Sequence, residues 1–155
     1  MSKSSNRSTI CFIQQMKISN SLFLLILFFG CAATQPQADD ATLQSWVGIW
    51  RGVAIVEESN NPPDEWILLL TKDNARLRGR ISSRQGLFSR MKVEKITVTA
   101  NELSFTFSYE TSRGLRAVFN NSAIREGHKL LSIFQGSEGG RAFRGRWEAR
   151  YEPRE

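Results

Sequence analysis

Apolar and polar residues alternate with a period of two over much of the chain from Trp46 onward, and this alternation limits the possible folds more than any other feature. In residues 103–109 Leu, Phe, Phe and Tyr occupy alternate positions, and Ser, Thr and Ser lie between them. This alternation is typical of β-strands that have one buried face. No stretch of ten or more residues shows a convincing helical stripe of apolar side chains. The pattern therefore predicts an all-β domain.

The alternating segments are separated by short groups rich in Gly, Pro, Asn and Ser, which favour turns. The eight predicted strands are Val47–Glu57, Glu65–Thr71, Arg76–Ser82, Met91–Thr99, Leu103–Tyr109, Leu115–Ile124, Lys129–Gln135 and Ala142–Tyr151. Tight connections favour an antiparallel meander, and closing such a sheet removes its exposed edges. We therefore predict a small antiparallel up-and-down eight-stranded β-barrel over residues 46–152.

The first 31 residues have the organisation of an export signal. Lys17 precedes the apolar run of residues 22–30, and small residues follow it. At about 1.5 Å per residue this run is much shorter than a bilayer core of about 30 Å. Residues 1–15 form a long polar lead, so a translation start at Met16 is an alternative to Met1. Residues 32–45 follow the signal, and their polar composition predicts a flexible tether.

Residues 28–31, Phe-Phe-Gly-Cys, resemble the lipobox of bacterial lipoproteins, in which the cysteine is acylated and becomes the first mature residue. The family usually has Leu three residues before the cysteine, where this chain has Phe28. The resemblance implies a lipid anchor on Cys31, and Ala32 after it implies delivery to the outer membrane. We therefore expect an outer-membrane lipoprotein of the bacterial cell envelope that faces the periplasm. Ordinary cleavage after Ala33, giving a periplasmic or secreted protein, is the alternative.

Charge and residue usage exclude several classes of function. The formal net charge is +6, but the 124 residues after Cys31 carry 18 basic and 15 acidic residues. This excess of positive charge is too small to indicate a nucleic-acid partner. Both cysteines, Cys11 and Cys31, precede the predicted barrel, and His128 is the only histidine. A disulfide or a transition-metal site in the barrel is therefore not expected. No phosphate-binding or dinucleotide motif is present, so we predict no metal and no cofactor.

The residues that could support catalysis are few. His128 lies in a predicted turn, without a nucleophile and an orienting group beside it in the sequence. The acidic pairs 57–58 and 64–65 flank a proline-containing loop, where acidic residues usually only keep the loop hydrated. We assign no catalytic residue and predict that the protein is not an enzyme.

Gly48-Ile49-Trp50 at the start of the first strand resembles the G-x-W motif of the calycin-like barrels, among them the lipocalins and avidins. The resemblance implies that Trp50, preceded by Gly48, plugs one end of the barrel and that a cationic side chain near the last strand packs over it. Arg150 is the first candidate for this cation and Arg146 the second. In any other β domain Trp50 would be one more core aromatic residue.

The size of the domain and the export signal resemble small periplasmic lipoproteins with lipocalin-like barrels, including bacterial inhibitors of proteases and of lysozyme. Those inhibitors usually carry a disulfide, which this domain cannot form. The resemblance implies a binding protein for a small apolar or amphipathic molecule. The candidate contact residues are the interior aromatics Phe105, Phe107, Phe119, Phe134 and Trp147.

The alternative function is a non-enzymatic interaction or inhibitor protein that binds another envelope protein through barrel loops or an arginine-rich face. Arginine offers a planar fork that suits carboxylate and phosphate groups. The candidates for binding anionic groups are Arg78, Arg80, Arg144 and Arg146. The same spacing also fits an outer wall of cross-strand ion pairs. The sequence does not indicate an oligomeric state.

Overall fold

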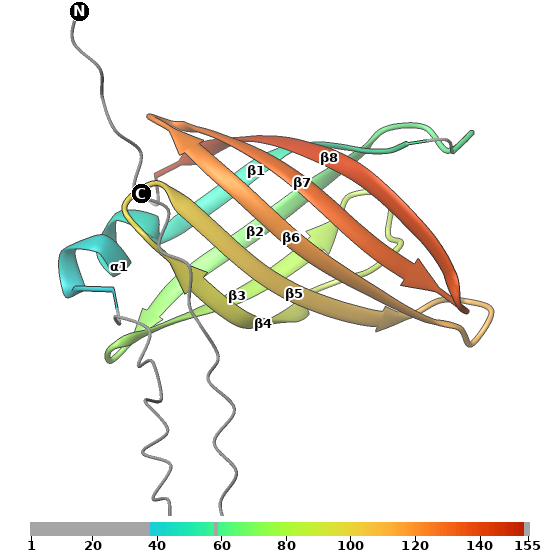
Figure 1. The fold of residues 1–155 in the computed structure, drawn as a ribbon, viewed down its shortest axis with the longest axis horizontal. Helices are drawn as coiled ribbons and strands as arrows, with labels where there is room; N and C mark the ends of the chain where they lie inside the picture. The colour runs from blue at the N-terminus through green and yellow to red at the C-terminus, as the bar shows by residue number, and fades with distance from the viewer. Residues whose placement is uncertain (1–37, 58, 154–155) are drawn as a thin grey trace, which may run out of the picture. The chain divides into compact units, whose positions relative to one another are not determined.

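The structure, a computed structural model, describes residues 38–57 and 59–153, which form one short helix and eight strands (Figure 1). The helix α1 spans Asp40–Trp46. The strands are β1 Gly48–Val56, β2 Asp64–Asp73, β3 Arg76–Ser83, β4 Met91–Val98, β5 Glu102–Glu110, β6 Arg116–Glu126, β7 Lys129–Glu138 and β8 Arg141–Glu152. Every predicted strand is present, with bounds that differ by a few residues. The predicted export signal, Cys31 and residues 32–37 of the tether lie outside the described residues.

The strands form a closed barrel in which each strand pairs with its neighbours in sequence order. All the pairs are antiparallel, and β1 closes the barrel by pairing with β8 from Ile49↔Glu152 to Val56↔Gly145. Closure leaves no sheet edge exposed. The predicted all-β, up-and-down eight-stranded barrel is confirmed.

Side chains fill the middle of the barrel. Alternate residues of β5 and β6 point inward, and the rings of Phe107 and Phe119 stack with centroids 4.6 Å apart. The ring of Trp66 lies 4.9 Å from that of Phe134 and 6.3 Å from that of Trp147. A barrel of eight strands has an interior just wide enough for its own side chains. The middle of this barrel is therefore a packed aromatic core.

The helix α1 replaces part of the predicted tether. Its N-cap Asp39 accepts a hydrogen bond from the backbone N–H of Thr42 at 2.7 Å, which is typical of helix N-termini. Leu43 and Trp46, three residues apart, lie on one helix face, and both are buried. The prediction of a tether is therefore wrong for residues 40–45. A seven-residue helix is too short to show a helical period in the sequence.

No helix within residues 38–57 and 59–153 combines the length and the apolar character needed to span a bilayer.

Candidate functional site

Trp50 lies at the end of the barrel where α1 sits, and its side chain is fully buried. Its indole N–H donates a hydrogen bond to the carbonyl oxygen of Trp46 at 3.2 Å. The ring of Tyr151 lies 5.2 Å away, and the phenol of Tyr151 donates to the carbonyl oxygen of Val47 at 3.1 Å. A Cβ atom on Gly48 would come within 2.4 Å of the Tyr151 ring, so the glycine permits this close packing. These contacts close this end of the barrel.

The cation over the plug is Arg125 of β6, not Arg150 or Arg146. The Arg125 guanidinium carbon lies 5.3 Å from the ring centroid of Trp46 and 5.4 Å from that of Trp50, within cation–π range. Its nitrogens also donate to the carbonyl oxygens of Ser45 and Gly127, at 2.7 and 2.9 Å. Arg150 and Arg146 are exposed because they share the outward face of β8. Strand alternation therefore excludes both from the plug.

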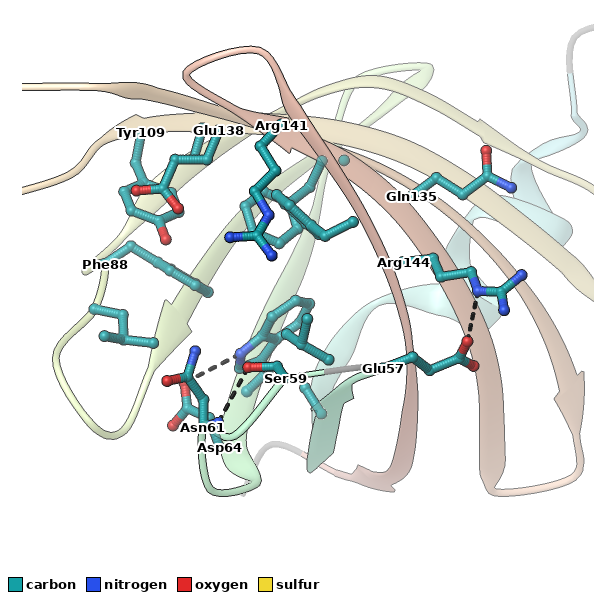
Figure 2. Close-up of a pocket in the computed structure, with 18 of the residues that line it drawn as sticks. Glu57, Ser59, Asn61, Asp64, Phe88, Tyr109, Gln135, Glu138, Arg141 and Arg144 are labelled. Atoms are coloured by element: carbon teal, nitrogen blue, oxygen red, sulfur yellow. Dashed lines mark hydrogen bonds and ion pairs between the residues drawn. The ribbon is translucent and has the colours of Figure 1, made fainter.

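The opposite end of the barrel holds an open pocket of about 1060 Å³. We call this pocket the mouth pocket; it lies among the β1–β2 and β3–β4 loops and the β7–β8 hairpin (Figure 2). Aromatic side chains from five elements form its apolar lining: Trp66, Phe88, Tyr109, Phe119 and Phe143. Polar and charged side chains from the loops form much of the rest, including Glu57, Asn61, Gln85, Glu138, Arg141 and Arg144.

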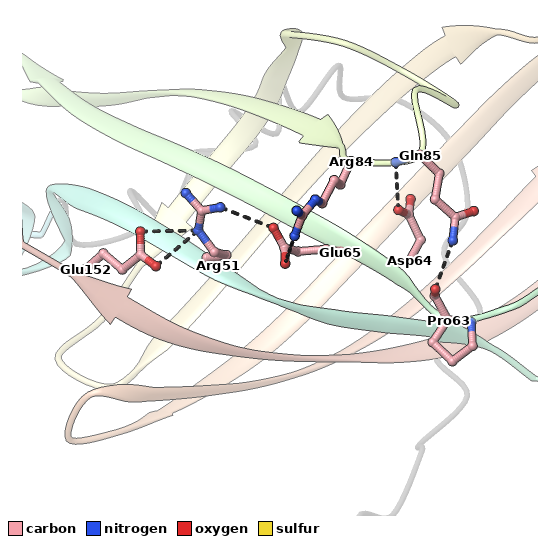
Figure 3. A network of polar contacts seen from close by, with 7 residues as sticks. All are labelled: Arg51, Pro63, Asp64, Glu65, Arg84, Gln85 and Glu152. Carbon is pink, nitrogen blue, oxygen red and sulfur yellow. Dashed lines mark hydrogen bonds and ion pairs between the residues drawn. The ribbon is translucent and has the colours of Figure 1, made fainter.

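A buried carboxylate fixes one wall of the mouth pocket. Asp64 at the start of β2 accepts hydrogen bonds from the indole N–H of Trp66 at 3.1 Å and from the hydroxyl of Ser83 at 2.5 Å. It also accepts from the backbone N–H of Gln85 at 3.1 Å, shown in Figure 3. The Gln85 side-chain amide donates to the carbonyl oxygen of Pro63 at 3.0 Å. This network ties the β3–β4 loop to β2 and holds the Trp66 ring in place.

Tyr109 brings a neutral phenol to the pocket. Burial raises its pKa above the usual value of 10.0, and the negative charges of Glu138 and Asp64 raise it further. Figure 2 shows Tyr109 and Glu138 on the same side of the pocket. At neutral pH the phenol therefore keeps its proton and can both donate and accept a hydrogen bond.

Arg141 contributes a positive charge to the pocket. Within the described residues, no acidic side chain forms an ion pair with it. It follows the Gly139-Gly140 turn, and Figure 2 shows its side chain extending into the pocket. Arg144, on the same strand, instead forms an ion pair with Glu57 at 2.7 Å. No sequence motif marks Arg141 or Tyr109. The only indication in the sequence that Arg141 and Tyr109 line a pocket is that they lie near the ends of β8 and β5 that face the mouth.

The predicted ligand-contact residues take two different positions. Phe119 lines the mouth pocket. Phe105, Phe107, Phe134 and Trp147 do not line it and are at most 1% exposed within the core. The structure therefore places open space beside Phe119 and packed side chains around the other four, and contact of any of the five with a ligand stays a prediction.

The four arginines predicted to bind anions do not form one site. Arg78 and Arg80 lie on β3, whereas Arg144 and Arg146 lie on β8, and β1 and β2 separate the two strands. Arg78 forms an ion pair with Asp73, and only Arg144 lines the pocket. The outer wall carries further pairs, such as the Arg51, Glu65, Glu152 and Arg84 network in Figure 3. Exposed pairs of this kind contribute about 0–1 kcal/mol each.

Comparisons with protein-family models, with curated proteins and with solved structures gave no match for this chain. The closed antiparallel barrel is consistent with a lipocalin-like fold. Within the described residues, no three His, Cys, Asp or Glu side chains are placed to hold a metal ion.

Proposed function

We propose that this chain is a binding protein of the bacterial cell envelope that holds a small amphipathic molecule in the mouth pocket. The observation that carries the proposal is a pocket of about 1060 Å³ at the end of the barrel opposite the Trp50 plug. Small-molecule sites typically have volumes of roughly 300–1,000 Å³, apolar linings and a few convergent polar groups. The mouth pocket is about this large and combines aromatic side chains with polar ones from the surrounding loops, and we assign the protein no catalytic residue.

The lining indicates which part of a ligand lies where. The rings of Trp66 and Phe119 offer an apolar floor, on which the body of a ligand would be removed from water. Arg141 extends into the pocket without a carboxylate partner among the described residues, so it suits a polar or anionic end group. A ligand with an apolar body and a polar end fits both features.

Two fluorescent dyes test this assignment: anilinonaphthalene sulfonate, which has an apolar body and an anionic end, and the uncharged N-phenylnaphthylamine. We expect both to bind the folded protein with one-to-one stoichiometry, measured by fluorescence titration. We expect Arg141→Gln to weaken binding of the sulfonate about threefold to tenfold, because one solvent-accessible, charge-assisted contact is lost. Binding of the uncharged dye should not change.

Arg150→Gln is the matched control, because Arg150 lies on the outward face of the same strand and is exposed. It should leave the titration of both dyes unchanged. Non-saturable dye binding, or an equal effect of the two substitutions, would contradict the assignment of the mouth pocket.

The location in the envelope rests on the resemblance of residues 28–31 to a lipobox. We expect Cys31→Ser to move the protein from the membrane fraction to the soluble fraction of cells, because the acylated cysteine would be its anchor. Ser resembles Cys in size, so the change tests the thiol specifically. A protein that stays with the membrane after this substitution is held there by something other than Cys31.

One observation favours the alternative of an interaction protein. The outer face of β6 and β7 exposes Ile124, Leu131 and Ile133, which are 52%, 40% and 66% exposed. Leu131 pairs directly with Ile124 across the two strands. Neighbouring exposed apolar side chains of this kind are found at protein-binding surfaces. If neither dye binds, this face becomes the first region to test for a protein partner.

A further inference from the structure

Two inward-pointing side chains leave polar atoms unpaired inside the barrel. Asn121 of β6 is 4% exposed and Trp147 of β8 is fully buried. Within the described residues, the amide oxygen and nitrogen of Asn121 and the indole N–H of Trp147 are the only buried side-chain polar atoms without a hydrogen-bond partner. Leaving such groups unpaired costs folding free energy, so each calls for an explanation.

The rest of the core shows that this fold pairs its buried polar groups. The indole N–H groups of Trp46, Trp50 and Trp66 donate to oxygen atoms at 2.9, 3.2 and 3.1 Å. Asp64 accepts from Ser83, and the hydroxyl of Ser132 donates to the carbonyl oxygen of Ser122 at 3.3 Å. Asn121 and Trp147 are therefore exceptions to this pairing.

The strand register places the two exceptions in one region. Only β7 separates β6 from β8. Asn121 pairs with Phe134, which pairs in turn with Gly145, and Trp147 is the next inward-pointing residue after Gly145 on β8. Asn121 and Trp147 therefore point into the barrel from the two strands that flank β7, at levels two residues apart.

This region lies next to the floor of the mouth pocket. Phe119, which lines the pocket, is the inward neighbour of Asn121 on β6 toward the mouth. Trp66 also lines the pocket, and its ring centroid lies 6.3 Å from that of Trp147. Phe119 separates the pocket from Asn121 along β6, so the inner end of a ligand reaches the unpaired groups only if the Phe119 ring moves aside.

We propose that Asn121 and Trp147 recognise an uncharged hydroxyl group, of an alcohol or a phenol, on the inner end of the ligand. A hydroxyl accepts a hydrogen bond from the indole N–H and donates one to the Asn121 amide oxygen. A charged group does not suit this region, because Asn121, Ser132 and Trp147 offer it no counter-ion among the aromatic rings. This inference rests on the proposed function of the mouth pocket and specifies its ligand class.

The test compares naphthol with naphthalene, which share one apolar body and differ in a hydroxyl. We expect wild-type protein to bind naphthol about tenfold more tightly, as one buried hydrogen bond implies, measured by isothermal titration calorimetry. Naphthol, but not naphthalene, should shift the NMR signals of the Asn121 amide protons and the Trp147 indole proton. These signals are measured on the wild-type protein. Substitutions are needed only to assign them.

Asn121→Leu should remove the tenfold preference while binding of naphthalene is retained, because Leu has the same branched shape and no polar atoms. Trp147→Phe, which removes the indole N–H, should reduce the preference as well. Asn120→Leu is the matched control, since Asn120 points outward on the same strand and is exposed.

The outcomes separate the two proposals. Equal binding of naphthol and naphthalene, with both sets of NMR signals unmoved, would overturn the inference and would assign the unpaired groups to a buried water alone. The mouth pocket would then stand if the dyes still bind. If no probe binds at all, the proposed function fails, and the hydroxyl site fails with it.

Discussion

Trp50→Ala is expected to lower the free energy of unfolding by about 3–5 kcal/mol, the usual cost of truncating a large buried aromatic residue. Trp50 is fully buried, and its ring lies 5.2 Å from the ring of Tyr151 and 5.4 Å from the guanidinium carbon of Arg125. Removing the indole would leave a cavity at the closed end and would also remove the hydrogen bond to Trp46. Urea unfolding followed by circular dichroism measures this loss.

Val53→Ala is the control for this measurement. Val53 lies on the same strand, and its side chain is 48% exposed on the outer face. Truncating an exposed side chain should change the free energy of unfolding by no more than about 0.5 kcal/mol. An unfolding curve of Trp50→Ala that matches the wild-type curve would show that Trp50 does not close the barrel.

The sequence predicts the barrel well because the alternation of apolar and polar residues along a strand directly reflects which side chains are buried. On β5, Leu103, Phe105 and Phe107 are each 1% exposed, whereas the serine and threonine residues between them are half-buried. The side-chain period of a strand is two, so this contrast indicates both the strand and its inner face. The helix α1 gives a much weaker signal, because only Leu43 and Trp46 mark its buried face.

The cation over the plug could not be predicted from position along the chain. The family resemblance indicates a cation near the last strand, which leads to Arg150. Alternation is the better guide: Arg125 shares the inward face of β6 with Ala123 and Asn121, whereas Arg150 shares the outward face of β8 with Arg146. A contact between β6 and the start of β1 depends on closure of the barrel, which no local pattern encodes.

The mouth pocket was not predictable for a different physical reason. Asp64, Tyr109 and Arg141 come from three strands and lie at least 30 residues apart in the sequence, and only the register of the closed sheet brings them to one end. The unpaired atoms of Asn121 and Trp147 are equally invisible in the sequence. An asparagine in a strand indicates neither its depth in the core nor whether its amide has a partner.

Gly52→Ala is expected to destabilise the protein by about 3 kcal/mol, the upper end of the usual cost of overpacking. Gly52 of β1 pairs with Ala149 of β8 at the seam that closes the barrel. A Cβ atom on Gly52 would lie 1.8 Å from the carbonyl oxygen of Glu148 and 2.4 Å from the Cα atom of Ala149. Both are backbone atoms, so the clash can be relieved only by moving β8 away from β1.

Gly79→Ala is the matched control for this prediction. A Cβ atom on Gly79 of β3 would lie 3.0 Å from the Cδ2 atom of Leu70 and the Cβ atom of Val93, which are longer contacts than those at Gly52 and involve no backbone atom. We therefore expect a smaller loss, about 1 kcal/mol. Thermal unfolding of both variants measures the difference. Equal unfolding midpoints would mean that the pairing of β1 with β8 tolerates displacement as easily as the side-chain packing around Gly79. Closure of the barrel would then not require a glycine at position 52.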